Sequence, residues 1–483
     1  GVGGTLAFNI VSAGTSYVNP EIIIPEPNYD NLPVVGVSRL GVGATTDTGS
    51  NLLIDVEVGA SRTTVGIGST TFEISKFSIA RPGHSFKIGD KFKPVGLVTA
   101  AHLTKPINEF ELEVLGEIPT ELSGRYLRNG PNPFAEVPSN HHWFLGAGMV
   151  HGIRLLEGEA KWYRNRYVGS AELSKFRDQD DIYGYNWNNS SGGPNTNVGG
   201  FAGKTWAMVE AGGCPVELDY ELETLGRNNF EGTLPGAFTA HPKIDPSSGE
   251  MHAMTYAWPQ WFDHVQYVVV ATNGQVRKTL DIPLPGMTMM HDMSLTDKYA
   301  IIYDQPVTVD FNLLEEGSNF PFSWNPDHGN RVGFLPRLGD VDDIVWVDVP
   351  VGYAFHPMNA FDNDDGSVTI DLCNYEKMFN TDLRGPLGDG LPRLERWNVN
   401  PESRSVTIDV IDERANEFPR HRHDVGGQPY RYGYSVSISA DPADGWQTLK
   451  HDLQSGETMV FDHGTGRAGG EAVFVPKEAS DEE

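Results

Sequence analysis

Short apolar runs, several of them alternating with polar residues, recur along most of the chain and are separated by turn-forming residues. Beyond Phe110, Gly, Asp, Asn or Pro lies at or just after the end of each run. Runs of this length and alternation are typical of β-strands, and their regular spacing predicts an all-β protein built as a sandwich, barrel or propeller. The clearest predicted strands are Tyr267–Thr272, Tyr299–Asp304, Asp343–Val349, Ser367–Leu372, Ser405–Asp412 and Glu457–Asp462.

The first hundred residues show the same alternation with a different composition. Thr, Ser, Gly and Val are abundant there, His and Trp are scarce, and Leu52–Gly59 and Thr71–Gly83 have the pattern of half-buried strands. We therefore predict a separate small β domain over residues 1–105 and a second domain over residues 106–483. The small domain weakly resembles structural modules of tailed marine phages. A natural fusion and the joining of two unrelated reading frames both remain open.

Composition narrows the classes of partner. The chain has 483 residues, and 65 Asp and Glu against 36 Lys and Arg give a formal charge of −29. This charge would repel the phosphates of nucleic acids and the headgroups of anionic lipids. No apolar run reaches the length of a membrane span, and the start GVGGTLAFNI lacks both a Met and the basic residues of a signal peptide.

Cysteine usage favours a reducing compartment. The two cysteines, Cys214 and Cys373, lie in or near apolar β-like stretches. Cysteines in such stretches are typical of buried free thiols rather than of a disulfide. We expect a cytoplasmic protein.

Three histidines stand in separate short settings, each after an expected strand or strand end. They are His241 in TAHPKID, His291 in MTMMHDMSLT and His356 in YAFHPMNAFDN. Three imidazoles from separate strands can converge on one metal ion, and neutral imidazole suits iron, zinc and copper. The chain has 15 His, and a histidine in a strand is more often a packed or surface residue. Spacing alone therefore leaves both roles open.

These histidines belong to an ordered set of motifs that covers roughly three quarters of the chain. The other motifs are Leu112–Pro133, His141–Leu155, Val209–Leu218, Glu417–Arg422 and Gly470–Lys477. In this order they resemble the carotenoid cleavage oxygenases. The resemblance implies a seven-bladed β-propeller with a metal on its axis. It also implies an enzyme, a dioxygenase that cleaves a conjugated C=C bond with O2 and gives two carbonyl products.

The resemblance further implies a non-haem Fe(2+) held by four histidines without a carboxylate ligand. His241, His291 and His356 match the first three. The fourth lies after the GE-x-VFVP motif in the family, whereas no histidine follows His463 here. We therefore expect a C-terminally truncated chain with an incomplete last blade and weak activity or none.

In the family, glutamates hold the second ring nitrogen of the ligand histidines, and this sequence has counterparts of them. Glu210, Glu417 and Glu471 match the family motifs, and such partners fix the tautomer and orientation of the ring. We expect each of them to be buried beside a ligand histidine. His141, His142 and His151, in a motif typical of a family β-hairpin, are expected to be structural.

The substrate is expected to be apolar and conjugated, which requires a long apolar tunnel. Trp143, Trp206, Phe238, Trp258 and Phe355 are candidates for its lining, with core packing as the alternative. Carotenoids or apocarotenoids are the favoured substrates, and stilbenes are the next candidates. A peripheral membrane contact is also expected, through which the apolar substrate is taken up. Two other classes remain: a non-enzymatic virion or attachment protein on a degenerate oxygenase scaffold, and a zinc hydrolase, for which no nucleophile or base signature is present.

Overall fold

The computed structural model describes residues 107–475 except 111, 113, 115, 135–140, 185–191, 440–445 and 465–466, and, of the preceding residues, the backbone of six strands. The chain divides into two compact units, residues 1–108 with 132–139, and residues 109–131 with 140–483. The predicted boundary near residue 105 lies outside the described residues. Both that boundary and the phage-like character of the small domain stay predictions.

The first unit contains one six-stranded sheet in the order β1-β2-β6-β3-β4-β5. The predicted strand Leu52–Gly59 lies in β4, and Thr71–Gly83 largely overlaps β5, so both strands are confirmed. The pairing is antiparallel except between β2 and β6, which run parallel. The strands are β1 (Gly4–Ala7), β2 (Glu21–Ile24), β3 (Val37–Ala44), β4 (Leu52–Thr64), β5 (Thr70–Arg81) and β6 (Lys91–Leu97).

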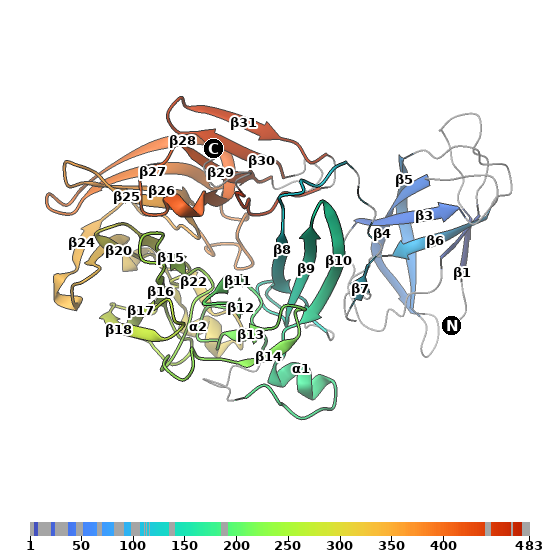
Figure 1. Cartoon of the computed structure of the whole chain (residues 1–483), viewed down its shortest axis with the longest axis horizontal. Coiled ribbons are helices and arrows are strands. Elements are labelled where there is room, and N and C mark those ends of the chain that lie inside the picture. The colour runs from blue at the N-terminus through green and yellow to red at the C-terminus, as the bar shows by residue number, and fades with distance from the viewer. Residues whose placement is uncertain are drawn as a thin grey trace. The chain divides into compact units, whose positions relative to one another are not determined.

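The chain from Ile107 onward begins with two sheets of four strands (Figure 1). Their orders are β7-β10-β9-β8 and β11-β12-β13-β14. The first consists of β7 (Ile107–Glu109), β8 (Gly124–Pro131), β9 (Gly148–Leu156) and β10 (Glu159–Tyr167). The second consists of β11 (Asn197–Phe201), β12 (Lys204–Met208), β13 (Val216–Leu218) and β14 (Thr224–Arg227), and the helix α1 (Ala171–Phe176) lies between the two in sequence.

The next two sheets have the orders β15-β16-β17-β18 and β19-β20-β23-β24. The third sheet consists of β15 (Lys243–Ile244), β16 (Met251–Thr255), β17 (His264–Val270) and β18 (Val276–Pro283). The fourth consists of β19 (Ser294–Leu295), β20 (Tyr299–Asp304), β23 (Arg331–Pro336) and β24 (Val345–Asp348). Between β20 and β23 the chain forms a two-stranded sheet of β21 (Val307–Val309) and β22 (Phe322–Trp324), which flank the helix α2 (Phe311–Glu315).

The last seven strands form one continuous sheet that is two four-stranded sheets joined by a shared strand. Residues 405–415 of β28 pair with β27, and residues 416–421 of the same strand pair with β29. The strands are β25 (Pro357–Asp362), β26 (Val368–Asn374), β27 (Arg393–Asn400), β28 (Ser405–His421), β29 (Tyr432–Ser437), β30 (Thr448–Asp452) and β31 (Glu457–Phe461). The described part of the chain also contains single-turn 3-10 helices at Pro326–His328, Val341–Asp343 and His423–Val425.

The all-β prediction is confirmed, since the two α-helices of the described residues have only six and five residues. Each of the six strands predicted beyond Phe110 coincides with a strand of the structure, β17, β20, β24, β26, β28 or β31. Four-stranded antiparallel sheets that follow one another along the chain are the blades of a β-propeller. The described residues of this unit form six such sheets, so the blade number of seven stays a prediction.

Burial along the strands follows their place in each sheet. Middle strands such as β16, β17, β20 and β26 are buried along nearly their whole length. The outer strand β18 and the first half of β28 alternate between exposed and half-buried positions instead. Middle strands therefore pack on both faces, whereas outer strands have one face in water.

Two composition-based predictions concern single features. Cys214 and Cys373 are both free and buried, as predicted. Within the described residues, no helix is long and apolar enough to cross a membrane.

Candidate metal centre

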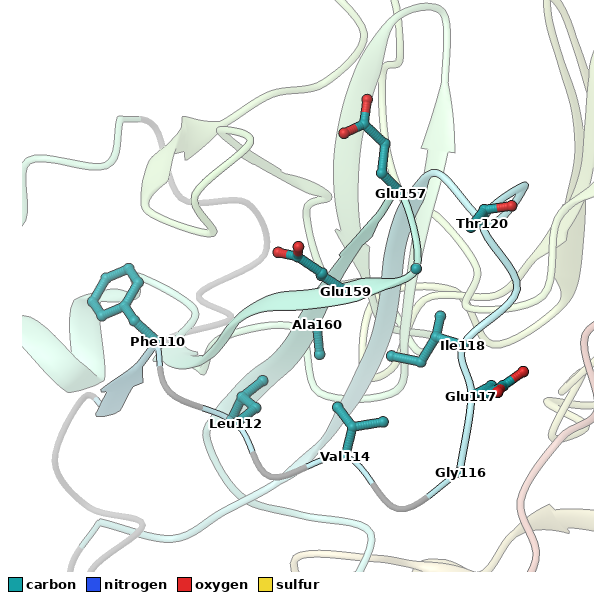
Figure 2. A pocket seen from close by; sticks show the side chains of 11 residues that line it. Phe110, Leu112, Val114, Gly116, Glu117, Ile118, Thr120, Glu157, Glu159 and Ala160 are labelled. Carbon is teal, nitrogen blue, oxygen red and sulfur yellow. The ribbon is translucent and has the colours of Figure 1, made fainter.

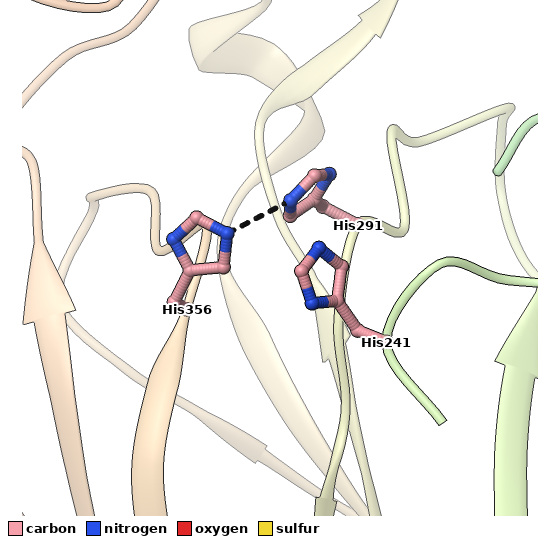
Figure 3. Close-up of side chains that lie close together, drawn as sticks. All are labelled: His241, His291 and His356. Carbon is pink, nitrogen blue, oxygen red and sulfur yellow. Dashed lines mark hydrogen bonds between the residues drawn. The ribbon is translucent and has the colours of Figure 1, made fainter. Parts of the chain in front are cut away.

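Each of the three histidines precedes the first strand of its own sheet. His241 lies two residues before β15, His291 three residues before β19, and His356 directly before β25. The positions are equivalent in three successive sheets, so the side chains meet (Figure 3). One ring nitrogen from each histidine lies within 4.8 Å of those of the other two. The structure thus brings together the three residues that the motifs predicted as metal ligands.

Two of the histidines are held by glutamates through the ring nitrogen Nδ1. His291 Nδ1 lies 2.9 Å from Glu210 Oε1, and His356 Nδ1 lies 2.7 Å from Glu417 Oε2. An ionised carboxylate can only accept, so each imidazole donates its Nδ1–H and has a lone pair on Nε2. Each carboxylate therefore selects the tautomer that a metal ligand needs.

The other ring nitrogens of these two histidines face each other. His291 Nε2 and His356 Nε2 are 3.1 Å apart (Figure 3). With both Nδ1 protons on carboxylates, two lone pairs would meet at this distance, an arrangement that needs a proton or a cation to be stable. Burial opposes protonation of His356, but the neighbouring Glu417 raises the pKa of this imidazole above its ordinary value. The electrostatics of the pair therefore favour positive charge at the point where the Nε2 atoms converge.

His241 completes the cluster with an unpaired nitrogen. Its Nε2 is buried and has no hydrogen-bond partner among the described residues. Burial holds the pKa of His241 well below its ordinary value, and the neighbouring imidazoles and the cations Lys243 and Arg420 act in the same direction. A neutral imidazole with a buried free lone pair is suited to bind a metal ion.

The third predicted glutamate has a different partner. Glu471 Oε2 accepts a hydrogen bond from the Arg420 guanidinium at 3.0 Å, and its side chain is 36% exposed. The structure thus places Glu210 and Glu417 on the histidine cluster and Glu471 on an arginine.

Two tyrosines stand behind the buried glutamates, and the motifs did not reveal them. Tyr256 donates its hydroxyl proton to Glu210 Oε2 at 3.1 Å. Burial raises the pKa of Tyr375 well above its ordinary value, and the nearby carboxylate of Glu417 adds to this rise. Both tyrosines occupy apolar strand-like sequence that is equally typical of core packing, so no sequence signal distinguished them.

Aromatic side chains cover one side of the cluster. Phe355 meets the His291 ring edge-on with centroids 5.1 Å apart, and Phe418 lies 5.6 Å from the His356 ring. From Phe355 the aromatic contacts continue through Phe144 to Trp143, which is 48% exposed. A row of packed aromatic rings therefore connects the histidine cluster with the exposed Trp143.

The other predicted lining residues lie in separate packing clusters. Trp206 and Phe238 pack together with Phe230 in the core, and Trp258 packs on Phe262 and Phe322.

The histidines of the hairpin motif have partners outside the cluster. His141 Nε2 lies 2.9 Å from the Leu145 carbonyl oxygen, and His151 Nδ1 lies 2.7 Å from the Tyr163 hydroxyl. His142 stacks on Phe320 with centroids 3.9 Å apart, and burial lowers the pKa of its imidazole to about 4.

A hollow of about 670 Å³ lies elsewhere, beside the turn between β9 and β10 (Figure 2). Its wall includes apolar side chains such as Phe110, Leu112 and Ile118, and the carboxylates Glu157 and Glu159. The lining residues include no histidine, cysteine, lysine or arginine. This hollow therefore has no ligand set comparable with the histidine cluster.

The chain is similar to known proteins in sequence and in fold. The family model described as retinal pigment epithelial membrane protein matches residues 100–483. The carotenoid cleavage oxygenase of Mycobacterium tuberculosis is 38% identical over 433 residues, which cover 78% of this chain and 85% of that protein. The carotenoid 9,10(9',10')-cleavage dioxygenase of Crocus sativus is 30% identical, with 76% and 75% covered.

Solved structures show the same relationship. The lignostilbene dioxygenase of Pseudomonas brassicacearum superposes with a TM-score of 0.70 at 26% identity, covering 78% of this chain and 85% of that chain. Cobalt-substituted Synechocystis ACO superposes with a TM-score of 0.67 at 23% identity, covering 78% and 86%, which supports the fold alone.

Fold and site together define a β-propeller protein with a cluster of three imidazoles that could hold a metal. The chain belongs to the carotenoid cleavage oxygenase family, non-haem iron enzymes that cleave conjugated C=C bonds oxidatively. The family membership and the dioxygenase activity predicted from the motifs are confirmed.

Proposed function

We propose that this chain binds Fe(2+) through His241, His291 and His356 and cleaves a conjugated C=C bond of a carotenoid or apocarotenoid with O2, giving two carbonyl products. The observation that supports this most strongly is the convergence of the three imidazoles, two of them with Nδ1 on a buried or half-buried glutamate. Neutral imidazole is a ligand that iron accepts, and carboxylates on the second ring nitrogen strengthen such a site.

The residues around the site have separable roles in this proposal. Bound iron would supply an open coordination position for O2. Glu210 and Glu417 keep the two rings in one tautomer and orientation, and their charges offset the positive charge of the ion. Phe355 and Phe418 cover the rings and keep water from that side of the site.

We assign Glu471 to a fourth imidazole, which the family pattern places after the motif that contains this glutamate. Among the described residues, the partner of Glu471 is Arg420. Exchange of this partner costs little, because both side chains are partly exposed and exposed ion pairs contribute about 0–1 kcal/mol.

A carotenoid is favoured over a stilbene as substrate. The relative described as a carotenoid cleavage oxygenase is 38% identical to this chain, whereas the resveratrol cleavage oxygenase of Aspergillus fumigatus is 29% identical. The row of aromatic rings from Phe355 to Trp143 suits an extended conjugated chain.

We also propose a peripheral membrane contact for uptake of the apolar substrate. Phe262, Phe311 and Leu314 are exposed, and the Phe262 and Phe311 rings stack with centroids 6.1 Å apart. The helix α2, which carries Phe311 and Leu314, has no buried residue. Because the net charge is −29, we expect binding to zwitterionic rather than anionic vesicles, and loss of that binding in Phe311→Asp.

Metal analysis and oxygen uptake test the main proposal. Purified protein should retain iron and consume O2 with an added carotenoid, forming two carbonyl products, with slower turnover of resveratrol. Tight zinc binding with no O2 consumption on either substrate would contradict it and favour a hydrolase. Aldehyde products from resveratrol alone would move the substrate class to stilbenes.

A further inference from the structure

His241 differs from the other two histidines of the cluster in its second ring nitrogen. Among the described residues, no glutamate forms a hydrogen bond with it. Its Nδ1 faces Asp292 instead, with Oδ2 at 3.9 Å. This separation is too long for a hydrogen bond, but a charge buried at this distance still attracts an N–H strongly, because little water screens it.

Asp292 is a buried carboxylate with a firm anchor. Its side chain is 3% exposed, Oδ1 accepts the Met293 backbone N–H at 2.6 Å, and Lys243 Nζ lies 2.8 Å from Oδ1 and 2.9 Å from Oδ2. The lysine offsets most of the cost of burying this charge. Oδ2 has lone pairs left for a further donor, and the nearest ring nitrogen is His241 Nδ1.

The chain itself ties this ion pair to the cluster. Asp292 directly follows His291, and Lys243 comes two residues after His241. The pair therefore links the backbone segments that carry two of the three histidines. If the ion pair served only the stability of the fold, its carboxylate would need no particular orientation toward a histidine. Here the carboxylate faces Nδ1 of His241, and the other ring nitrogen, Nε2, has no partner among the described residues.

We infer that Asp292, anchored by Lys243, is the positioning residue of His241: it keeps the imidazole proton on Nδ1 and leaves the Nε2 lone pair to the metal. This inference rests on the proposed metal site. Asp292 thus does for His241, at longer range, what Glu210 and Glu417 do for His291 and His356.

Cobalt(II) titration of the full chain, followed by its visible absorption bands, tests the inference. Asp292→Asn should weaken cobalt binding about 10- to 100-fold, the usual loss when a residue that orients a ligand histidine is changed. The absorption bands should also shift. The matched control is Asp371→Asn. Asp371 is equally buried, and its partner Arg396 has a side chain 27% exposed, against 25% for Lys243, but neither residue belongs to the cluster. This control should lose stability and keep its cobalt affinity.

The outcomes separate this inference from the metal site itself. A wild-type chain that binds no cobalt refutes the proposed site. A wild-type chain and an Asp292→Asn variant of equal affinity leave the site standing and overturn the role of Asp292. Long-range 1H–15N NMR of histidine-labelled wild-type protein gives a second measurement if the variant does not fold. We expect the proton of His241 on Nδ1, and a proton on Nε2 would overturn the inference.

Discussion

The three glutamates predicted beside the histidine cluster fall into two classes, which differ in burial and in partner. Glu210 and Glu417 are buried or nearly so, each contacts an imidazole, and Tyr256 donates to Glu210. Glu471 is 36% exposed and contacts Arg420. A buried carboxylate cannot lose its partner without a large desolvation cost, whereas an exposed one exchanges partners through water. All three glutamates match family motifs, but their different surroundings make two of them dependent on a ring partner and leave the third free to exchange its partner.

Removal of a ligand histidine should have the largest effect on metal binding. His291→Ala deletes one of the imidazoles and leaves the buried Glu210 without its ring partner, so iron retention should fall by more than about 100-fold and O2 consumption with it. Iron content and oxygen uptake of the purified variant check this. The control His463→Ala removes a histidine that contacts Thr448 and should change neither. Equal iron loss in both variants would contradict the assignment.

The two classes of glutamate should separate by about an order of magnitude. Glu417→Gln can no longer attract the His356 Nδ1–H as an anion, so metal affinity should fall about 10- to 100-fold. Glu471→Gln in the same 483-residue chain should change affinity less than about twofold, because its partner is Arg420. Iron or cobalt titration of both variants measures the difference. Equal losses of metal affinity in the two variants would contradict the difference between Glu417 and Glu471.

A segment that carries a fourth histidine should make Glu471 resemble the other two glutamates. When a family-like segment is joined after Glu483, we expect iron occupancy to rise about tenfold and carotenoid cleavage to increase with it. The same segment with Ala in place of that histidine is the control. Equal iron occupancy with His and with Ala at that position would contradict the role assigned to Glu471.

A smaller effect than that of a ligand or of its glutamate should come from the tyrosine behind Glu210. Tyr256→Phe removes a hydrogen bond to a charged group, a change that costs about 1.5–3 kcal/mol when the acceptor stays buried, and part of it should appear as a loss of metal affinity of about tenfold or less. Cobalt titration measures it. The matched variant Tyr303→Phe removes a buried hydroxyl that contacts Ser294 and should leave the affinity unchanged. An unchanged affinity in both would limit Tyr256 to a packing role.

The strands and the candidate ligands could be predicted from the sequence by itself. Alternation with a period of two, as in Ser405–Asp412, and short continuous apolar runs, as in Tyr299–Asp304, are local properties, and both coincide with strands of the structure. The settings of His241, His291 and His356 contained enough of the family pattern to mark them as a set, and the structure brings them within 4.8 Å of one another.

Only the tertiary structure decided which carboxylate faces which ring. Glu210 and His291 are 81 residues apart: Glu210 follows β12, His291 precedes β19, and the whole sheet β15-β16-β17-β18 lies between them in sequence. The same packing turns Asp292 toward His241 and leaves Glu471 in partial contact with water beside Arg420. Burial and cross-sheet distance are properties of the packed chain, and a period of two along one strand contains no information about them.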